Sequence, residues 1–510
     1  MKIADSSGKE LTGRQLLINT CVLRNYMRRR ILSPDEQFVG IILPPTVVTT
    51  VVNLAMTLDK RVVVNLNYTV SAEIMNQCIK TAGIKHILTS RKVMEKLNYK
   101  NLDAEVVILE DCVKDISLSD KLFGALYGYL PSWLTERLLG LTCVSPDDLL
   151  TVVFTSGSTG VPKGVMLTHD NIGSNIVSFM DLERLKYPDS LLGILPSFHS
   201  FGFICNIWAV CTTDIQAAYH YSPLEPKAIG KLCRKYKNTI MVATPTFYRQ
   251  YIRKCEPEDL ATIEVPVTGA EKMPLEVLDA YEAKFGHRPL EGFGCTECSP
   301  VVAANILPER REHPLEVLRK DGSIGLPVPG CMVEIRDVDT RKTLGANEVG
   351  MMWVKGRNVM KGYLNMPEKT AEVLVDGWYC TGDLARMDED GFIFITGRLS
   401  RFSKIGGEMV PHEGIENAIS KIIGCDPDEP ICVTASSIPD EKKGEKIIIL
   451  YSDLKGKTPD DIIVEMRNLG QPPIWIPALD AFYKVDQIPI LGTGKLDIQG
   501  AKKMAQELAK

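Results

Sequence analysis

Short runs of β-branched and other apolar residues recur along the first half of the chain, and segments with helical spacing separate them. The runs are FVGIIL (38–43), RVVVNL (61–66), HILTS (86–90), VVILE (106–110), LLTVVFT (149–155), LLGILP (191–196), TIMVAT (239–244) and IEVPVTG (263–269). Strands that alternate with helices favour parallel sheets with crossover helices, and continuous apolar runs are typical of strands buried on both faces. The sequence therefore predicts an α/β fold of doubly wound sheets.

The pattern changes twice in the second half. From about residue 322 short strands and turns dominate, which indicates a small β-rich subdomain over 322–397. A glycine-rich, charged segment follows, and after it come a helix, two strands and a second helix. A chain of 510 residues is too long for one hydrophobic core. We expect an N-terminal core over 1–397, a hinge at 398–403 and a smaller, mobile α+β C-terminal lid over 404–510.

Charge and cysteine content exclude several classes of protein. The net charge of −5 and the pI of about 5.9 give no global basic field, so nucleic acid is not an expected partner. The 14 cysteines are scattered, as expected for reduced thiols in a cytosol. Their only close pair, Cys295 and Cys298, is a weak zinc signal because no second pair or nearby histidine accompanies it.

Membrane and export signals are weak. The first residues contain no apolar segment of the kind found in signal peptides. Two long uncharged stretches, 38–58 and 190–213, are interrupted by prolines and polar residues, so each is interpreted as a strand, a turn and a buried helix. We expect a cytoplasmic protein, and peripheral contact with the inner membrane stays open.

One segment, 123–141, is rich in Leu, Tyr and Trp. The favoured interpretation is a buried helix pair broken by Pro131. The alternative is an interfacial segment or the mouth of a lipid tunnel.

The strongest chemical signal directly follows the strand at 149–155. It is TSGSTGVPKG (155–164), in which hydroxyls and glycines leave backbone N–H groups free to converge on an anion while a lysine adds charge. It does not match the Walker A spacing. A flexible surface turn is the alternative. The phosphate-binding candidates are Thr155, Ser156, Gly157, Ser158, Thr159, Gly160 and Lys163.

This loop resembles the phosphate loop of the adenylate-forming superfamily, which includes acyl-CoA synthetases, luciferases and peptide-synthetase adenylation domains. Further motifs similar to those of the family follow in order up to residue 495. The resemblance implies ATP and Mg²⁺ as cofactors. It also implies formation of an acyl-adenylate with release of pyrophosphate, and transfer of the acyl group to a thiol after the lid turns about its hinge.

The resemblance assigns roles in GFGCTE (292–297) and in the TGAE segment before it. Phe293, with Gly294, would pack on adenine, Thr296 would bond a phosphate and Glu297 would bind Mg²⁺. In TGAE, the residues at the edge of the adenine would be Gly269, Ala270 and Glu271.

Roles in the last third of the chain are implied in the same way. Asp383, in YCTGD, would accept hydrogen bonds from the ribose hydroxyls, and Arg398 would lie near ribose and phosphate. Arg401 would be the hinge residue. Lys495, in GTGK, would bridge the carboxylate and the α-phosphate. The catalytic candidates are then Lys495, Glu297 and Thr155.

The segment LPSFHSFG (195–202) bears on the acid that is activated. Members of the family that activate amino acids usually have an aspartate here to pair with the ammonium group, and this segment contains no acidic residue. An acid without an amine is therefore favoured, and the segment is similar to that of fatty-acyl members. His199 either shapes the substrate pocket or is a core histidine.

A finer resemblance is to the synthetase half of the bacterial bifunctional acyltransferase/acyl-acyl-carrier-protein synthetase, carried by 64–74, 86–96 and 401–416. It implies a long-chain fatty acid as substrate and the phosphopantetheine thiol of acyl carrier protein as acceptor. No H-x4-D acyltransferase motif is present, so a stand-alone synthetase is expected. The alternatives are a medium- or long-chain fatty acyl-CoA synthetase and a non-catalytic binding homologue.

Overall fold

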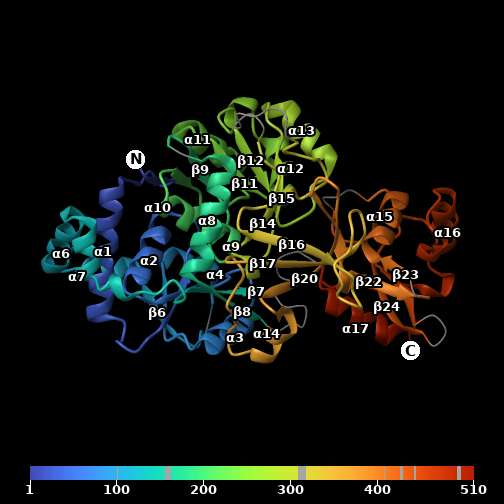
Figure 1. The fold of residues 1–510 in the computed structure, drawn as a ribbon, viewed down its shortest axis with the longest axis horizontal. Coiled ribbons are helices and arrows are strands. Elements are labelled where there is room, and N and C mark those ends of the chain that lie inside the picture. Colours follow the sequence, from blue (N-terminus) through green and yellow to red (C-terminus); the bar gives the residue numbers. More distant parts are fainter. Residues whose placement is uncertain are drawn as a thin grey trace.

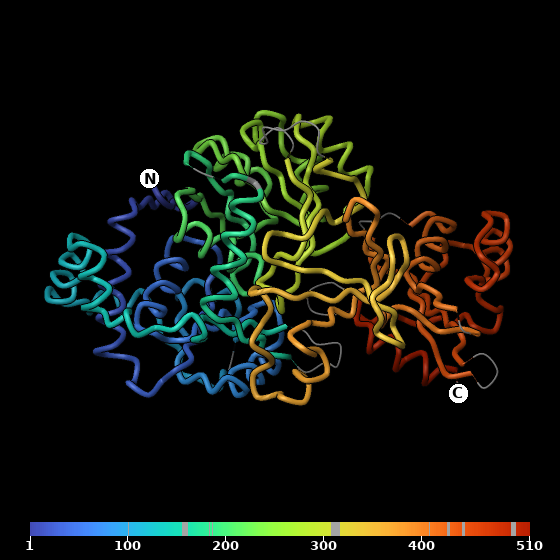
Figure 2. The backbone as a smooth tube through the Cα atoms, viewed as in Figure 1, coloured from blue at the N-terminus to red at the C-terminus, as the bar shows by residue number. Residues whose placement is uncertain are grey.

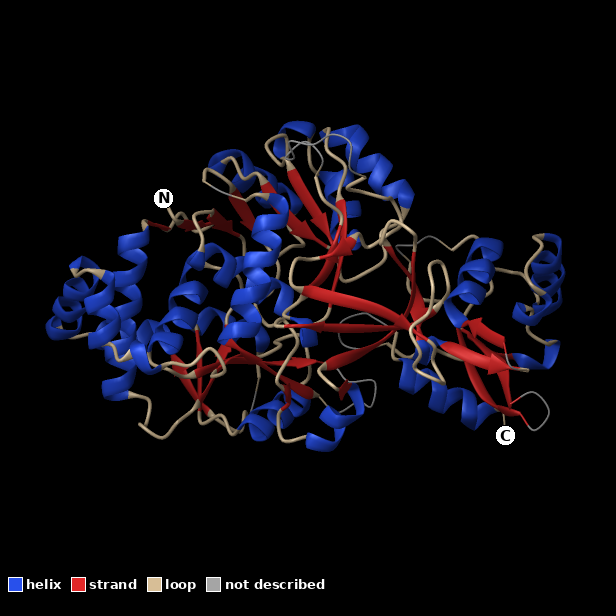
Figure 3. Ribbon diagram, in the orientation of Figure 1, coloured by secondary structure: helices blue, strands red, loops and turns tan. Residues whose placement is uncertain are grey.

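A computed structural model describes residues 1–99, 101–155, 162–185, 187–307, 317–406, 408–425, 429–440, 444–490 and 496–509. Two large sheets that contain most of the parallel strands form the first part of the chain, and two smaller sheets follow them (Figure 1). Helices flank the sheets, and the predicted α/β class is confirmed (Figure 3).

The first large sheet has the strand order β18-β8-β7-β4-β3-β5-β6. Its strands β3 to β7 are parallel, whereas β8 and β18 are antiparallel additions at one edge. The strands are β3 (Phe38–Ile42), β4 (Val62–Asn65), β5 (His86–Thr89), β6 (Glu105–Ile108), β7 (Leu149–Thr155), β8 (Lys163–Thr168) and β18 (Gly362–Tyr363), and the crossover helices are α2 (Val47–Leu58), α3 (Ala72–Ala82) and α4 (Arg91–Leu97).

The second large sheet has the order β15-β14-β13-β12-β11-β9-β10-β1-β2. Its strands are β1 (Ile3–Asp5), β2 (Glu10–Leu11), β9 (Ser190–Gly193), β10 (Gln216–Tyr219), β11 (Ile240–Ala243), β12 (Val265–Thr268), β13 (Leu290–Gly294), β14 (Val301–Ala304) and β15 (Leu326–Pro327). The main helices beside it are α8 (His169–Glu183), α11 (Pro226–Tyr236), α12 (Pro245–Lys254) and α13 (Leu275–Phe285). Side chains on both faces of this sheet are buried, which explains why its strands consist of uninterrupted runs of apolar residues.

Both uncharged stretches fold as predicted. The first contains β3, a turn at the prolines and α2. The second contains β9, a loop, the short helix α9 (Ser200–Phe203), a π-helical turn η2 (Ile204–Ala209) and α10 (Val210–Thr212). No helix within the described ranges is long and apolar enough to cross a membrane.

The helix pair expected within 123–141 exists, but the prediction that it is buried is wrong. Helix α6 (Leu118–Tyr129) and helix α7 (Ser132–Leu138) meet at Pro131 and project at one end of the molecule beside α1 (Gly13–Arg30) (Figure 1). Most of their large apolar side chains are exposed. The reason is that α6 packs on α1 through its glycines, which leaves the larger side chains outside.

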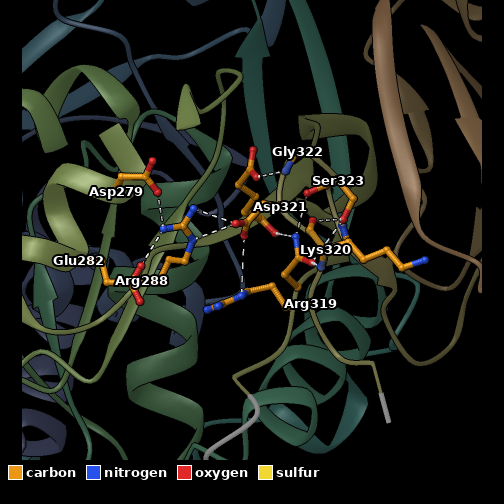
Figure 4. A network of polar contacts seen from close by, with 11 residues as sticks. Asp279, Glu282, Arg288, Arg319, Lys320, Asp321, Gly322 and Ser323 are labelled. Carbon is orange, nitrogen blue, oxygen red and sulfur yellow. Dashed lines mark hydrogen bonds and ion pairs between the residues drawn. The ribbon is translucent and has the colours of Figure 1, made fainter. Parts of the chain in front are cut away.

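The β-rich sheet contains the strands β16 (Cys331–Arg336), β17 (Gly350–Gly356), β20 (Trp378–Met387), β19 (Leu374–Val375) and β21 (Ile393–Arg398), all paired antiparallel. A charged network ties α13 to the turn that precedes this sheet (Figure 4). The Arg288 guanidinium lies 2.8 Å from Asp279, 2.7 Å from Glu282 and 2.8 Å from Asp321. Bidentate and shared contacts of this kind fix the orientation of the joined segments.

The last part of the chain builds its own sheet, with β22 (Phe402–Ile405), β23 (Glu408–Pro411), β24 (Val433–Asp440), β25 (Gly444–Tyr451) and β26 (Phe482–Lys484). Its helices α15 (His412–Ile423), α16 (Pro459–Asn468) and α17 (Ile498–Leu508) enclose two separate apolar clusters. This C-terminal unit, orange to red in Figure 2, lies at the end of the molecule opposite α6 and α7. A hinge at 398–403 and a mobile lid stay predictions.

Candidate active site

The base of the predicted phosphate loop is a β-hairpin. Thr155 ends β7 and pairs with Lys163, the first residue of β8. The loop residues between them, Ser156 to Gly160 among them, lie outside the described residues. The Lys163 ammonium lies 4.8 Å from the centre of the Tyr363 ring, within the range of a cation–π contact. The lysine is therefore held beside the base of the loop.

Tyr363 also contacts the predicted metal ligand. Its hydroxyl donates a 2.9 Å hydrogen bond to Oε1 of Glu297, and the Met360 N–H donates to the Glu297 carbonyl at 2.8 Å. Burial of the ring, followed by the negative charge of Glu297, raises the pKa of Tyr363 well above its usual range, so the hydroxyl stays a donor. Glu297 lies in a 3₁₀ turn, η4 (Thr296–Cys298), and β18 carries the tyrosine. The sequence analysis missed this residue.

The residues around Glu297 fit a magnesium site of the substrate-bridged type. Mg²⁺ prefers oxygen ligands and is commonly held by one or two carboxylates together with substrate phosphates. Within the described part of the chain, no group of three or more His, Cys, Asp or Glu side chains could enclose a metal on its own. Cys298 is fully buried, and burial raises the pKa of its thiol, which suits a packing role.

Asp383 and Arg398 form an ion pair at the base of the β20–β21 hairpin, where the two residues are direct cross-strand partners. Arg398 Nε lies 3.0 Å from Asp383 Oδ1. Burial raises the pKa of Asp383, the arginine opposes that shift, and the nearby charge of Glu297 adds to it. The carboxylate oxygens of this aspartate suit hydrogen bonds from a vicinal diol.

Several of the predicted residues share one large cavity of about 1760 Å³. Its wall includes Gly269, Ala270, Glu271, Phe293, Gly294, Thr296 and His199. The Thr296 and Ser200 hydroxyls are 3.2 Å apart, which joins the GFGCTE segment to the segment that contains His199. Ala270 has a left-handed φ of 68°, a conformation that residues other than glycine adopt uncommonly.

The same cavity has an apolar wall that the sequence analysis did not single out. Strand register aligns Leu191 of β9, Ile240 of β11 and Val265 of β12 across one face of the sheet, and all three line the cavity. Phe179 and Leu182 of α8 line it as well. Their neighbours in the strands, Leu192 and Met241 among them, belong to the core on the other face. Alternation along these strands thus separates the cavity wall from the core.

A family model described as AMP-binding enzyme matches residues 2–364. The chain belongs to this family. The matched region contains the phosphate loop, Glu297 and Tyr363 together with the whole cavity wall. Of the nucleotide-site candidates, Asp383 and Arg398 lie beyond it.

Named relatives of this AMP-binding enzyme include ligases that use CoA. It is 31% identical over 371 residues to the long-chain-fatty-acid–CoA ligase of Bacillus subtilis (strain 168), covering 71% of this chain and 62% of that protein. It is 32% identical to 4-coumarate–CoA ligase 1 of Arabidopsis thaliana, covering 68% and 62%. The match thus spans less than two thirds of the length of these relatives.

Solved structures with the same fold extend over the whole chain. ATP-bound MatB from Rhodopseudomonas palustris matches with a TM-score of 0.79 at 24% identity, covering 100% of this chain and 96% of that one. O-succinylbenzoate coenzyme A synthetase (MenE) from Bacillus subtilis, in complex with ATP and magnesium ion, matches with a TM-score of 0.78 at 20% identity, covering 98% and 96%. These matches establish the fold, including that of the C-terminal unit.

The predicted hinge residue of this AMP-binding enzyme is attached to the C-terminal unit. Arg401 forms an ion pair with Glu416 of α15, and Glu416 also accepts hydrogen bonds from Thr434 and from the Ala435 N–H. Any rotation of the unit would therefore carry Arg401 with it.

Lys495, the predicted catalytic lysine, lies outside the described residues. The loop that bears it is closed by a bridge between Ile490 and Leu496.

A buried histidine makes the C-terminal unit sensitive to acid. Burial, together with the charges of Arg401 and Lys502, lowers the pKa of His412 to about 3, and its Nε2 lies 2.7 Å from the Ser403 hydroxyl. Because this pKa lies below that of the unfolded chain, about 6.5, the stabilisation is present above pH 6.5 and is lost as pH falls towards 3. We expect the free energy of unfolding to fall by about 2 kcal/mol between pH 7 and pH 5.

Urea unfolding at both pH values, followed by the fluorescence of Trp475, measures this loss. The difference between the fluorescence of the wild type and that of a Trp475→Phe variant gives the signal of this tryptophan. The variant His412→Gln should lose most of the pH dependence, whereas His287→Gln, outside the C-terminal unit, should keep it. If the free energy of unfolding depends equally on pH in the wild type, His412→Gln and His287→Gln, the assignment to His412 is contradicted.

Proposed function

We propose that this protein is an AMP-forming acid–thiol ligase that activates a long-chain fatty acid and transfers the acyl group to the phosphopantetheine thiol of acyl carrier protein. The single observation that carries the activation of a long-chain acid is the cavity of about 1760 Å³, whose wall combines the residues assigned to the adenine with the apolar rows of β9, β11 and β12. The resemblance of 64–74, 86–96 and 401–416 supports acyl carrier protein as the acceptor. Ligand pockets usually measure roughly 300–1,000 Å³, so this volume supports two substrates bound side by side.

The first half-reaction joins the acid to the nucleotide. A carboxylate oxygen attacks the α-phosphorus of ATP, a new oxygen–phosphorus bond forms, and the bond to the bridging oxygen breaks with release of pyrophosphate. Negative charge grows on the phosphoryl oxygens during this step, and the Lys163 and Lys495 ammonium groups would stabilise it. Glu297 would hold Mg²⁺, and the metal would supply Lewis-acid stabilisation of the same charge.

Other residues hold the nucleotide and the acid. Asp383 would accept hydrogen bonds from the ribose hydroxyls, and Phe293 would cover one face of the adenine. The apolar wall would bury the alkyl chain, whose transfer from water is favourable by about 0.8 kcal/mol per CH₂ group. In the second half-reaction the thiol sulfur attacks the acyl carbon, and AMP leaves with both electrons of the cleaved carbon–oxygen bond.

The alternative acceptor is the thiol of CoA. The observation that favours it is the group of relatives named as CoA ligases, among them a long-chain-fatty-acid–CoA ligase of Yersinia pestis that is 30% identical. The same relatives leave an aromatic acid open as the substrate, because several are named 4-coumarate–CoA ligases.

A four-way assay separates these proposals. The full chain is incubated with ATP, Mg²⁺ and labelled palmitate or 4-coumarate, and either CoA or holo-acyl carrier protein is offered; apo-acyl carrier protein, which lacks the thiol, is the matched control. Palmitoyl-acyl carrier protein alone supports the proposal. Palmitoyl-CoA alone supports the alternative acceptor, and product from 4-coumarate alone would overturn the assignment of the substrate. Absence of acid-dependent AMP formation would favour a non-catalytic homologue.

A further inference from the structure

Helices α6 and α7 present an apolar surface to the outside of the molecule. Seven large side chains are between 48% and 72% exposed: Leu118, Leu122, Phe123, Leu126, Tyr129, Trp133 and Leu138. We call these seven residues the α6–α7 surface. The positions 118, 122, 126 and 129 follow helical spacing, so four of them form one stripe along α6. Apolar stripes of this kind normally face a protein core, and this one faces outward.

The outward orientation is fixed by the packing of α6 on α1. A Cβ atom added to Gly124 would lie 2.3 Å from a methyl group of Val22, and one added to Gly128 would lie 2.3 Å from Ile18. The glycines therefore permit a close approach that no larger residue could make, and they leave the opposite side of α6 to the Leu, Phe and Tyr side chains. Rotation of α6 to bury those side chains would place bulky groups where the glycines are.

Polar contacts hold both ends of this packing. At the start of α6, Asp120 forms an ion pair of 2.5 Å with Arg29, and Ser117 caps the helix. At its end, the Arg14 guanidinium lies 4.8 Å from the centre of the Tyr129 ring. The surface is thus a rigid part of the fold, with arginines of α1 beside each end of the stripe.

The charge around the surface is basic although the whole chain is acidic. Helices α1, α6 and α7 contain seven basic residues and two acidic ones, whereas the chain has a net charge of −5. The basic residues are Arg14, Arg24, Arg28, Arg29, Arg30, Lys121 and Arg137, and the acidic ones are Asp120 and Glu136. Arg24 is buried beside Asp59, so the other six supply the basic charge of the surface. One of the two acids, Asp120, is buried in its ion pair.

We propose that the α6–α7 surface binds an anionic phospholipid bilayer. Leucine and phenylalanine side chains would enter the acyl boundary, Tyr129 and Trp133 would lie at the level of the headgroups, and the arginines would face lipid phosphates. A second copy of the chain is a poorer occupant, because a two-fold interface would bring the same arginines of both copies together. The proposal does not depend on the proposed function, since the surface requires neither ATP nor an acid.

Vesicle sedimentation of the full chain, without ATP or fatty acid, tests the proposal. We expect binding to vesicles of phosphatidylcholine with phosphatidylglycerol, weaker binding to pure phosphatidylcholine, and loss of the difference as salt screens the arginines. The double variant Phe123→Ser/Trp133→Ser should lower the partition coefficient roughly 100-fold. Leu275→Ser removes a side chain that is similarly exposed, at 54%, on α13, and it should bind like the wild type.

Two further measurements distinguish insertion from other causes of binding. The vesicle-induced blue shift of tryptophan fluorescence should be lost in Trp133→Phe while sedimentation persists. Arg30→Glu/Arg137→Glu should weaken binding to anionic vesicles and leave thermal unfolding unchanged, since both side chains are exposed. Equal binding of the wild type and the Phe123→Ser/Trp133→Ser variant would overturn the proposal. A second result would also overturn it: the wild type does not bind vesicles but forms a dimer, and the Phe123→Ser/Trp133→Ser variant is monomeric. That result would assign the surface to a second copy of the chain.

Discussion

Glu297→Gln should lower the rate of acyl-adenylate formation by about 100- to 1000-fold, the effect expected when a preorganised electrostatic group is removed from a transition state. The substitution keeps the shape of the side chain and an oxygen that can accept the 2.9 Å hydrogen bond from Tyr363. It removes the negative charge of an oxygen ligand, and a hard cation such as Mg²⁺ binds a carboxylate more strongly than a neutral amide. Pyrophosphate exchange into ATP, dependent on added acid, measures the rate.

The dependence on Mg²⁺ identifies the cause of the loss. If Glu297 holds the metal together with phosphate oxygens, the variant should require a much higher Mg²⁺ concentration for half-maximal exchange. Tyr363→Phe, which removes only the hydroxyl that orients the carboxylate, should give a smaller loss, about tenfold, in the same direction. A Glu297→Gln enzyme with an unchanged Mg²⁺ requirement would show that the carboxylate has another role.

Glu291→Gln is the matched control, since it removes a carboxylate from the same segment. Glu291 lies in β13, accepts a 2.9 Å hydrogen bond from the Gly322 N–H, and does not line the cavity. Burial raises its pKa, which lowers the cost of replacing the carboxylate with a neutral amide. Exchange activity and its Mg²⁺ dependence should stay close to those of the wild type.

The strands of the two large sheets could be predicted, because a parallel strand that is buried on both faces consists of an uninterrupted run of apolar residues. Strands β3, β9 and β11 coincide with their runs to within a few residues. The roles of Glu297 and Asp383 rest on motifs, which are local in sequence. The structure adds that Asp383 is paired with Arg398, at 3.0 Å, and that Glu297 accepts a hydrogen bond from Tyr363.

What could not be predicted depends on contacts between distant segments. Tyr363 is 66 residues from Glu297 in sequence, and no spacing rule links a short edge strand to a 3₁₀ turn. The exposure of α6 was predicted wrongly for a related reason. Its composition indicates burial, but the close approach of Gly124 and Gly128 to α1 determines which side of the helix faces outward. The sequence of one helix alone does not predict how closely it packs on another.

Lys495→Ala should separate the two half-reactions. The lysine is expected to act only on the charge that develops during adenylation, so acid-dependent pyrophosphate exchange should fall by about 100- to 1000-fold. Transfer of the acyl group from supplied acyl-adenylate to the thiol should be nearly unchanged, because no phosphoryl charge develops in that step. ATP binding should also persist, since the groups assigned to the adenine and ribose lie in the cavity wall and at Asp383.

The contacts that flank Lys495 in the chain do not involve its side chain, so the substitution tests the ammonium group. The bridge between Ile490 and Leu496 and the 2.9 Å hydrogen bond from the Asp497 N–H to the Pro489 carbonyl close the loop at its base, so alanine at 495 leaves those contacts in place. Lys503→Ala, on α17 of the same unit, is the matched control for loss of a positive charge and should affect neither half-reaction. Equal losses in both half-reactions would indicate damage to the C-terminal unit, and unchanged exchange would remove the lysine from the chemistry. A loss confined to adenylation would support a C-terminal unit that contributes to one half-reaction and must move aside for the other.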